Sequence, residues 1–197
     1  MMFDHPLVIR IRTPVRVPCG GILQALLRFL DPQYKTDTGR EVESSGDGWP
    51  GYPDVTQAVA DAWLRANGFA GRVNKVGPPA DSYNCHGFTF TKGNKWVSCD
   101  QVKKILDDNG YQRVANPQVG DIVVYRNPGA GCPPDDITHT GKVVAVDNQG
   151  PIIESKWGRL GRYRHRPNDV PASYGAPSYY RTNRAGQGGN PHILNQR

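Results

Sequence analysis

The stretch THTGKVVAVDNQGPIIESKW, residues 138–157, carries the pattern that decides the fold. Two runs rich in β-branched residues, Thr138–Val146 and Pro151–Trp157, flank Asp147-Asn148-Gln149-Gly150, which is a hairpin signal. We therefore expect two antiparallel strands joined by a four-residue loop. Further strands are predicted over residues 122–126, 160–165 and 179–181.

Helical signals lie upstream of these strands. Asp54 is a suitable N-cap for a helix over Val55–Asn67, and Ser98 with Gln101 forms a capping-box pattern for a helix over Cys99–Asp108. Helices followed by antiparallel strands indicate an α+β fold, with the helices packed on one face of the sheet. An edge strand over 7–17, a helix over 22–30 and a long polar loop over 31–53 are expected before them, and a flexible tail over 183–197.

The composition is that of a folded protein without membrane spans. The 197 residues are 37% hydrophobic and 21% charged, and no apolar run approaches the roughly 20 residues that a span requires. Met1–Arg12 lacks the layout of a signal peptide. The chain is therefore expected to be made in the cytoplasm, and work elsewhere would require export by a dedicated secretion system.

The positive charge is concentrated near the C-terminus. Residues 151–197 hold 8 basic and 2 acidic side chains, so they carry the whole net charge of +6. One interpretation is a solvated surface, and the other is a surface that attracts a polyanion such as a cell-wall polymer. Nucleic acid is less favoured, because no nucleic-acid-binding motif accompanies the charge.

The cysteines favour nucleophilic chemistry over metal binding. Cys19, Cys85, Cys99 and Cys132 include no C-x-x-C pair, so we expect neither a metal site nor a cofactor, and disulfides stay unassigned. Cys85 lies in Asn84-Cys85-His86-Gly87, where a short helix is expected to begin, and a helix N-terminus favours a thiolate.

A cysteine nucleophile requires a base, and His139 is the candidate. His86 is adjacent to Cys85, and neighbours on a helix do not face each other. His139 begins a predicted strand, so a strand-borne histidine would face a helix-borne cysteine. The order of motifs, 84–87, then Val119–Val123, then Thr138–Val144, resembles the CHAP and NlpC families of papain-like amidases and endopeptidases over roughly residues 77–160.

The resemblance implies amide hydrolysis, often in peptidoglycan, by Cys85 and His139. It also implies a third polar residue on the following strand, for which Glu154 is the candidate. In a simple hairpin register Glu154 shares a face with His139 but lies opposite Val143, about 13 Å along the strand. A one-residue shift would place Ser155 on that face instead.

We therefore predict a cysteine hydrolase with a papain-like core over residues 77–182 and an extension over residues 1–76 that packs on it. Its expected substrate is a cell-wall peptide or a protein, and an exported antibacterial effector of this kind would have an immunity protein as partner. The alternatives are a deamidase or transglutaminase on the same fold, and a non-catalytic binding module with a basic surface.

Overall fold

The structure is a computed structural model that describes residues 33–46, 54–133 and 135–196. These residues belong to one unit that begins at Gln33, so residues 33–76 fold together with residues 77–182. The strand predicted over 7–17 and the helix predicted over 22–30 lie outside the described residues. None of the described helices is long and apolar enough to cross a bilayer.

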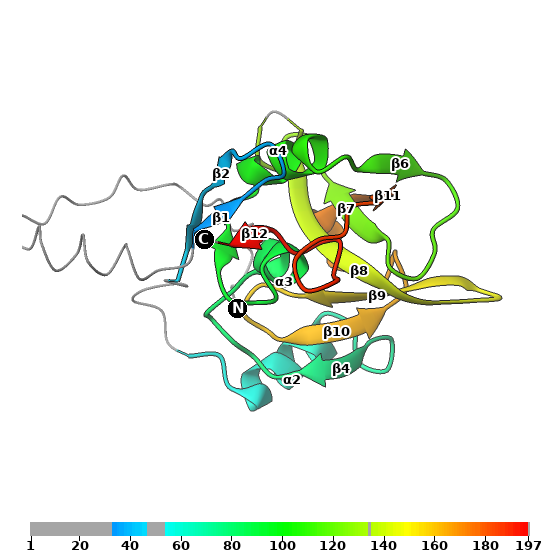
Figure 1. Ribbon diagram of the computed structural model, residues 1–197. Coiled ribbons are helices and arrows are strands. Elements are labelled where there is room, and N and C mark those ends of the chain that lie inside the picture. The colour runs from blue at the N-terminus through cyan, green and yellow to red at the C-terminus, as the bar shows by residue number, and fades with distance from the viewer. Residues whose placement is uncertain (1–32, 47–53, 134, 197) are drawn as a thin grey trace, which may run out of the picture. The chain divides into compact units, whose positions relative to one another are not determined.

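A seven-stranded antiparallel sheet organises the fold (Figure 1). Together with a few helices it confirms the α+β class. The strand order is β4-β10-β9-β8-β7-β11-β6. In that order the strands are β4 (Asn74–Gly77), β10 (Arg162–His165), β9 (Gly150–Lys156), β8 (Ile137–Asp147), β7 (Ile122–Arg126), β11 (Ala176–Arg181) and β6 (Gln112–Val114).

Helices cover both faces of this sheet, so the prediction of helices on one face is wrong. Side chains alternate along β7: Ile122 and Val124 enter one core, while Val123 and Tyr125 enter another. The first core is covered by α3 (Cys85–Phe90) and α4 (Asp100–Asp108). On the second face lie α2 (Gln57–Ala66) and the short 3₁₀ helix η1 (Ala172–Tyr174).

The β8–β9 hairpin forms as predicted at its loop and then changes register. Val146 pairs with Pro151, but an irregularity between Val143 and Ala145 places Lys142, not Val143, opposite Glu154. A bulge of this kind moves every later side chain of one strand to the other face. The carboxylate of Glu154 therefore shares a face with Lys142, whereas His139 lies on the opposite face.

The segments expected to be loop and tail contain ordered structure. Within 31–53 lie β1 (Tyr34–Lys35), β2 (Glu41–Val42) and β3 (Ser44–Ser45), which pairs with β5 (Trp96–Val97). Towards the other end, β12 (Asn195–Gln196) pairs with β1, and Ile193 and Leu194 are buried. The flexible tail predicted over 183–197 is therefore not seen in residues 183–196, because two apolar side chains and a ladder fix it to the core.

Two helix boundaries differ slightly from the prediction. The N-cap of α2 is Thr56, whose side chain accepts from the N–H of Val59, rather than Asp54. The N-cap of α4 is Cys99 and makes no side-chain capping bond, so the capping box of Ser98 does not form. The unpredicted strands β4 and β6 lie at the sheet edges and are mostly exposed, which leaves no hydrophobic alternation to detect.

Candidate active site

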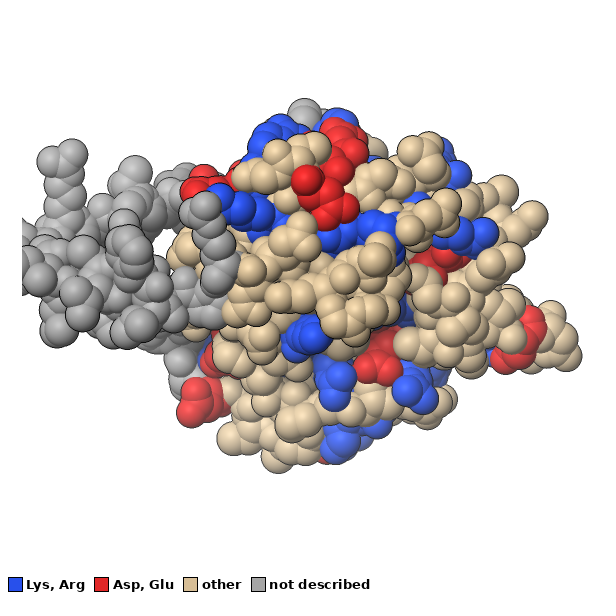
Figure 2. All heavy atoms as spheres, viewed as in Figure 1, with Lys and Arg blue, Asp and Glu red and all other residues tan. Residues whose placement is uncertain are grey.

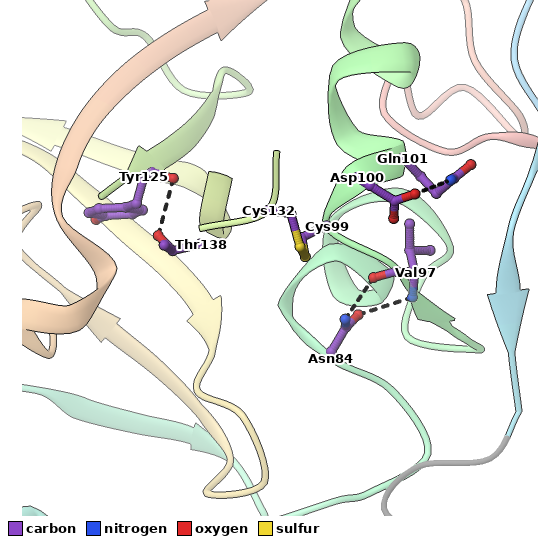
Figure 3. The surroundings of a disulfide bond; sticks show 8 residues. All are labelled: Asn84, Val97, Cys99, Asp100, Gln101, Tyr125, Cys132 and Thr138. Atoms are coloured by element: carbon purple, nitrogen blue, oxygen red, sulfur yellow. Dashed lines mark hydrogen bonds between the residues drawn. A yellow bond between two sulfur atoms is a disulfide. The ribbon is translucent and has the colours of Figure 1, made fainter. Parts of the chain in front are cut away.

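The nucleophile candidate begins a buried helix whose start is firmly anchored. Asn84 is the N-cap of α3, and its side-chain oxygen accepts from the N–H of Gly87 at 2.8 Å and of Val97 at 3.2 Å. Its amide nitrogen donates to the carbonyl of Val97 at 2.7 Å (Figure 3). These bonds tie the helix start to β5 and fix the position of Cys85.

Gly87 permits the close approach of α3 to the chain beside it. A Cβ atom at this position would lie 1.7 Å from the carbonyl oxygen of Lys95. No flexible side chain is involved in that contact, so a larger residue would have to move backbone. Asn84 and Gly87 thus position the helix that carries Cys85 against the neighbouring chain.

The thiol of Cys85 is buried and protonated in this arrangement. Cys85 is 8% exposed, and burial raises the pKa of its thiol to about 11. Hydrogen bonds from the backbone N–H groups of Thr140 and His86, and the positive charge of Lys156, lower the pKa in the opposite direction. These hydrogen bonds and the Lys156 charge favour a thiolate, but the effect of burial on the pKa is larger.

The sulfur lies where two strands separate. The ladder between β8 and β9 runs from Asp147–Gly150 to Lys142–Glu154. Thr140 and Lys156 lie beyond this last pair, one on each strand, and both act on the thiol. Cys85 therefore lies beside Thr140 of β8, at the open end of the hairpin.

His139 occupies the same segment of β8 and is also buried. It pairs with Tyr125, is 1% exposed, and its ring stacks on the ring of Tyr174 with centroids 3.9 Å apart. Burial, followed by the nearby His165 and His86, holds its pKa well below the usual value, so the imidazole is neutral. Within the described part of the chain its Nε2 is buried and has no hydrogen-bond partner. A buried polar atom without a partner is rare and suggests a function.

Tyr174 lies close to both groups. Its ring covers His139, and the negative charge of a Cys85 thiolate would raise the pKa of its hydroxyl beyond the effect of burial. The helix with Cys85 packs on the Thr140 face of β8, since the hydroxyl of Thr140 bonds His86 and Thr89. Cys85 therefore approaches β8 at Thr140 from one face of the sheet, while the side chain of the neighbouring His139 lies on the other face.

Glu154 is not brought to His139. Its carboxylate oxygens accept from Nη1 of Arg162 at 3.2 Å and Nε of Arg164 at 3.0 Å, on the face opposite His139. Ser155 lies on the His139 face, as the alternative register required. Its hydroxyl bonds Nε2 of His165 at 2.8 Å and accepts from the indole of Trp157 at 3.0 Å.

Sequence reasoning missed Lys156 as part of the site. It is 0% exposed, and its ammonium donates to the carbonyls of Ala80, at 2.8 Å, and of Gly158. Burial lowers its pKa to about 8, while the negative charges of Cys85 and Asp81 raise it. The available signal was a lysine inside the predicted strand 151–157, directly before Trp157, because a buried charge requires a partner.

A strap of chain, residues 170–175, covers the site on the His139 side. Besides the stacking of Tyr174, the hydroxyl of Thr138 donates to the Tyr174 carbonyl, and Nδ2 of Asn127 donates to the Ser173 carbonyl at 3.1 Å. Gly175 ends the strap with φ +80°, where a Cβ would lie 2.1 Å from the carbonyl oxygen of Arg126.

A cavity of about 480 Å³ opens beside this Tyr174 strap. Its lining comprises Val170, Pro171, Ala172 and Ser173 of the strap together with Trp63, Asn67, Phe69, Arg72 and Asn168. Its lining combines two aromatic rings, Trp63 and Phe69, with four polar side chains. The strap therefore separates a recess in the surface from the buried imidazole.

A disulfide removes two of the other cysteines from thiol chemistry. Cys99 at the start of α4 is joined to Cys132 in the loop between β7 and β8, with Cα atoms 5.7 Å apart (Figure 3). Among the described cysteines Cys85 is the free one, and Cys19 lies outside the described residues.

Comparison with known proteins identifies a family. Residues 74–182 match the model of the family described as "Domain of unknown function (DUF7689)", and the chain belongs to that family. The matched region contains Cys85, His139, Glu154, Lys156 and Tyr174. Neither the curated proteins nor the solved structures that were searched include a match to this chain.

Proposed function

We propose that this protein is a cysteine hydrolase of papain-like fold that cleaves amide bonds, with Cys85 as nucleophile and His139 as base. One observation carries the proposal: a free thiol at a helix N-terminus receives the backbone N–H of Thr140, the residue after His139, and the Nε2 of His139 is buried without a partner in the described part of the chain. Helix-borne cysteine and strand-borne histidine are the parts of a thiol hydrolase, recognised by their roles.

The described arrangement is a covered state of this site. The pKa values of both groups are displaced mainly by burial, in the directions that keep the thiol and the imidazole neutral. Moving the Tyr174 strap would hydrate the site, lower the pKa of the thiol and raise that of the imidazole. The proton would then pass from sulfur to His139, and the charge of Lys156 and the N–H of Thr140 would stabilise the thiolate.

The reaction follows from these groups. The Cys85 thiolate attacks the amide carbonyl carbon, and the oxyanion accepts from N–H groups at the start of α3. The C–N bond breaks as the imidazolium gives its proton to the leaving amine, which leaves a thioester on Cys85. Water then attacks the thioester, His139 takes a proton from that water, and the acid is released with the thiol restored.

Ser155, the other candidate for a third catalytic residue, shares the face of His139 in this register. Its hydroxyl is hydrogen-bonded to His165 and Trp157, so we assign Ser155 a structural role on the His139 face of the sheet. Glu154 lies on the face of the sheet opposite the imidazole and accepts from two arginines, so we leave it out of the proposed machinery. The proposed machinery is therefore a Cys85–His139 pair supported by Lys156.

We further propose a cell-wall peptide as substrate and a compartment outside the cytoplasm as the site of action. Disulfides persist in oxidising compartments, so the Cys99–Cys132 bond supports export. An antibacterial effector with an immunity protein fits these properties.

The direct test is digestion of purified peptidoglycan and of its stem peptides, with mass spectrometry of the products. The wild-type protein should produce new amine and carboxyl termini, and Cys85→Ser and His139→Ala should lower the rate by at least about 1,000-fold. His192→Gln is the matched control, because His192 is also buried but bonds Tyr111 and Gly120 away from the site. Undiminished cleavage by Cys85→Ser would contradict the proposal.

A further inference from the structure

Basic side chains gather over β9 and β10 on the face of the sheet that carries α3. Lys142, Arg162 and Arg164 lie there around Glu154, and Lys92 at the end of α3 is close enough to act on the charge of Lys142. In Figure 2 blue side chains surround a red one over these strands. We call these five residues the basic cluster; four cations around one carboxylate leave it with a net charge of +3.

The strand register arranges part of the basic cluster in a row. Lys142 lies opposite Glu154, and Glu154 lies opposite Arg164 in the next strand. Adjacent strands are about 4.8 Å apart, so the Cα atoms of Lys142 and Arg164 lie roughly 10 Å apart, with Glu154 between them. A bound polymer would therefore meet positive charges at a fixed spacing.

Internal contacts hold the cluster in place. Arg162 donates to Glu154 and to the carbonyl of Val76, and its guanidinium lies over Gly77, where a Cβ would be 2.6 Å from Nε. The ring of Phe88 lies beneath Lys142, at 4.8 Å, and beneath Arg162, at 5.5 Å. These contacts preorganise the cations before any ligand arrives.

Both carboxylate oxygens of Glu154 already accept hydrogen bonds, whereas N–H groups of the surrounding cations are still available to a ligand. Both of its oxygens are used by the two arginines, and its side chain is 12% exposed. Arg164 is 51% exposed and uses only Nε in that pair, which leaves its terminal nitrogens for a ligand. Within the described residues the ammonium of Lys142 makes no hydrogen bond, and burial lowers its pKa to about 8.

We propose that the basic cluster is a binding site for a phosphate-bearing polyanion. Each phosphate inside such a chain has two non-bridging oxygens that share one negative charge, and the chain repeats them, which suits several ammonium and guanidinium donors on one surface. Phe88 is buried under two cations, so its ring offers no stacking plane for a base, and we expect the cluster to read the charged backbone. The inference is independent of the proposed hydrolase, since Cys85→Ser should bind equally well.

The experiment measures binding of fluorescently labelled inorganic polyphosphate to the full chain by anisotropy, over a series of salt concentrations. The variants are Lys142→Met and Arg164→Met, which keep much of the side-chain stem but remove the charge. Arg113→Met is the matched control, because Arg113 is exposed on β6 at the opposite edge of the sheet. Circular dichroism verifies that each variant is folded.

We expect each cluster variant to bind roughly threefold to tenfold more weakly and to reduce the slope of log affinity against log salt by about 1, with Arg113→Met unchanged. Poly-L-glutamate of equal charge should bind at least about tenfold more weakly than polyphosphate. Equal or tighter binding of poly-L-glutamate would overturn the assignment of phosphate. Absence of polyphosphate binding, or equal weakening by Arg113→Met, would overturn the site itself.

Discussion

Tyr174→Ala should uncover the buried thiol and increase its reactivity. In the folded protein the pKa of the Cys85 thiol is raised to about 11, mainly by burial, from an ordinary value of 9.0. At pH 7.5 a pKa of 11 leaves a thiolate fraction of about 0.0003, whereas a pKa of 9 leaves about 0.03. Hydration alone should therefore raise the alkylation rate about 100-fold when the ring that covers the site is removed, before any proton transfer to His139.

The assay is iodoacetamide labelling at pH 7.5, followed by mass spectrometry of the peptide that contains Cys85. Deleting a large, partly buried aromatic ring costs about 3 kcal/mol of the free energy of unfolding, so general destabilisation must be controlled. Tyr180→Ala is the matched variant, because Tyr180 is also a partly buried tyrosine but packs on the α4 side of the sheet. A rate within threefold of wild type, or an equal increase in Tyr180→Ala, would refute the reasoning.

Three further predictions follow from the buried groups. Burial lowers the pKa values of His86, His165 and His192 to about 4, so between pH 6.5 and pH 4 the unfolded chain binds protons that the folded chain does not. As the pH is lowered through that window, the free energy of unfolding should fall by up to about 4 kcal/mol per pH unit. Urea denaturation should show this as a falling midpoint, and a constant midpoint would contradict it. Glu154→Gln should leave the peptidoglycan cleavage rate within about threefold, whereas a 100-fold loss would restore Glu154 to the catalytic site. Reduction of the disulfide, or Cys132→Ser, should cost about 4 kcal/mol by the loop-entropy model for a separation of 33 residues, and urea denaturation showing no loss would argue against that bond.

The local signals in the sequence predicted several features well. A short helix was predicted to begin at Cys85, as α3 does, and the Asp147–Gly150 turn predicted the end of the hairpin, because turn chemistry depends on neighbouring residues. The β7 strand was predicted at its observed bounds from a run of apolar residues. The α+β class followed from the order of these elements.

The features that depend on tertiary contacts could not be predicted. No local pattern marks the irregularity near Val144, yet it decides whether Glu154 or Ser155 shares the face of His139. Tyr174 has no sequence signal, because its importance comes from stacking on a residue 35 positions away. The short strand β12 forms only because β1 provides a partner for it, which neither segment reveals alone.

The pairing of Cys85 with His139 is tested most directly by the pH dependence of Cys85 alkylation in Tyr174→Ala, with and without the additional change His139→Ala. If the uncovered groups exchange a proton, Tyr174→Ala should stay reactive down to about pH 6.5, and the double variant should react as an ordinary thiol with a pKa of about 9. Identical pH profiles for the two proteins would show that the imidazole does not act on the sulfur, and would contradict the proposed hydrolase.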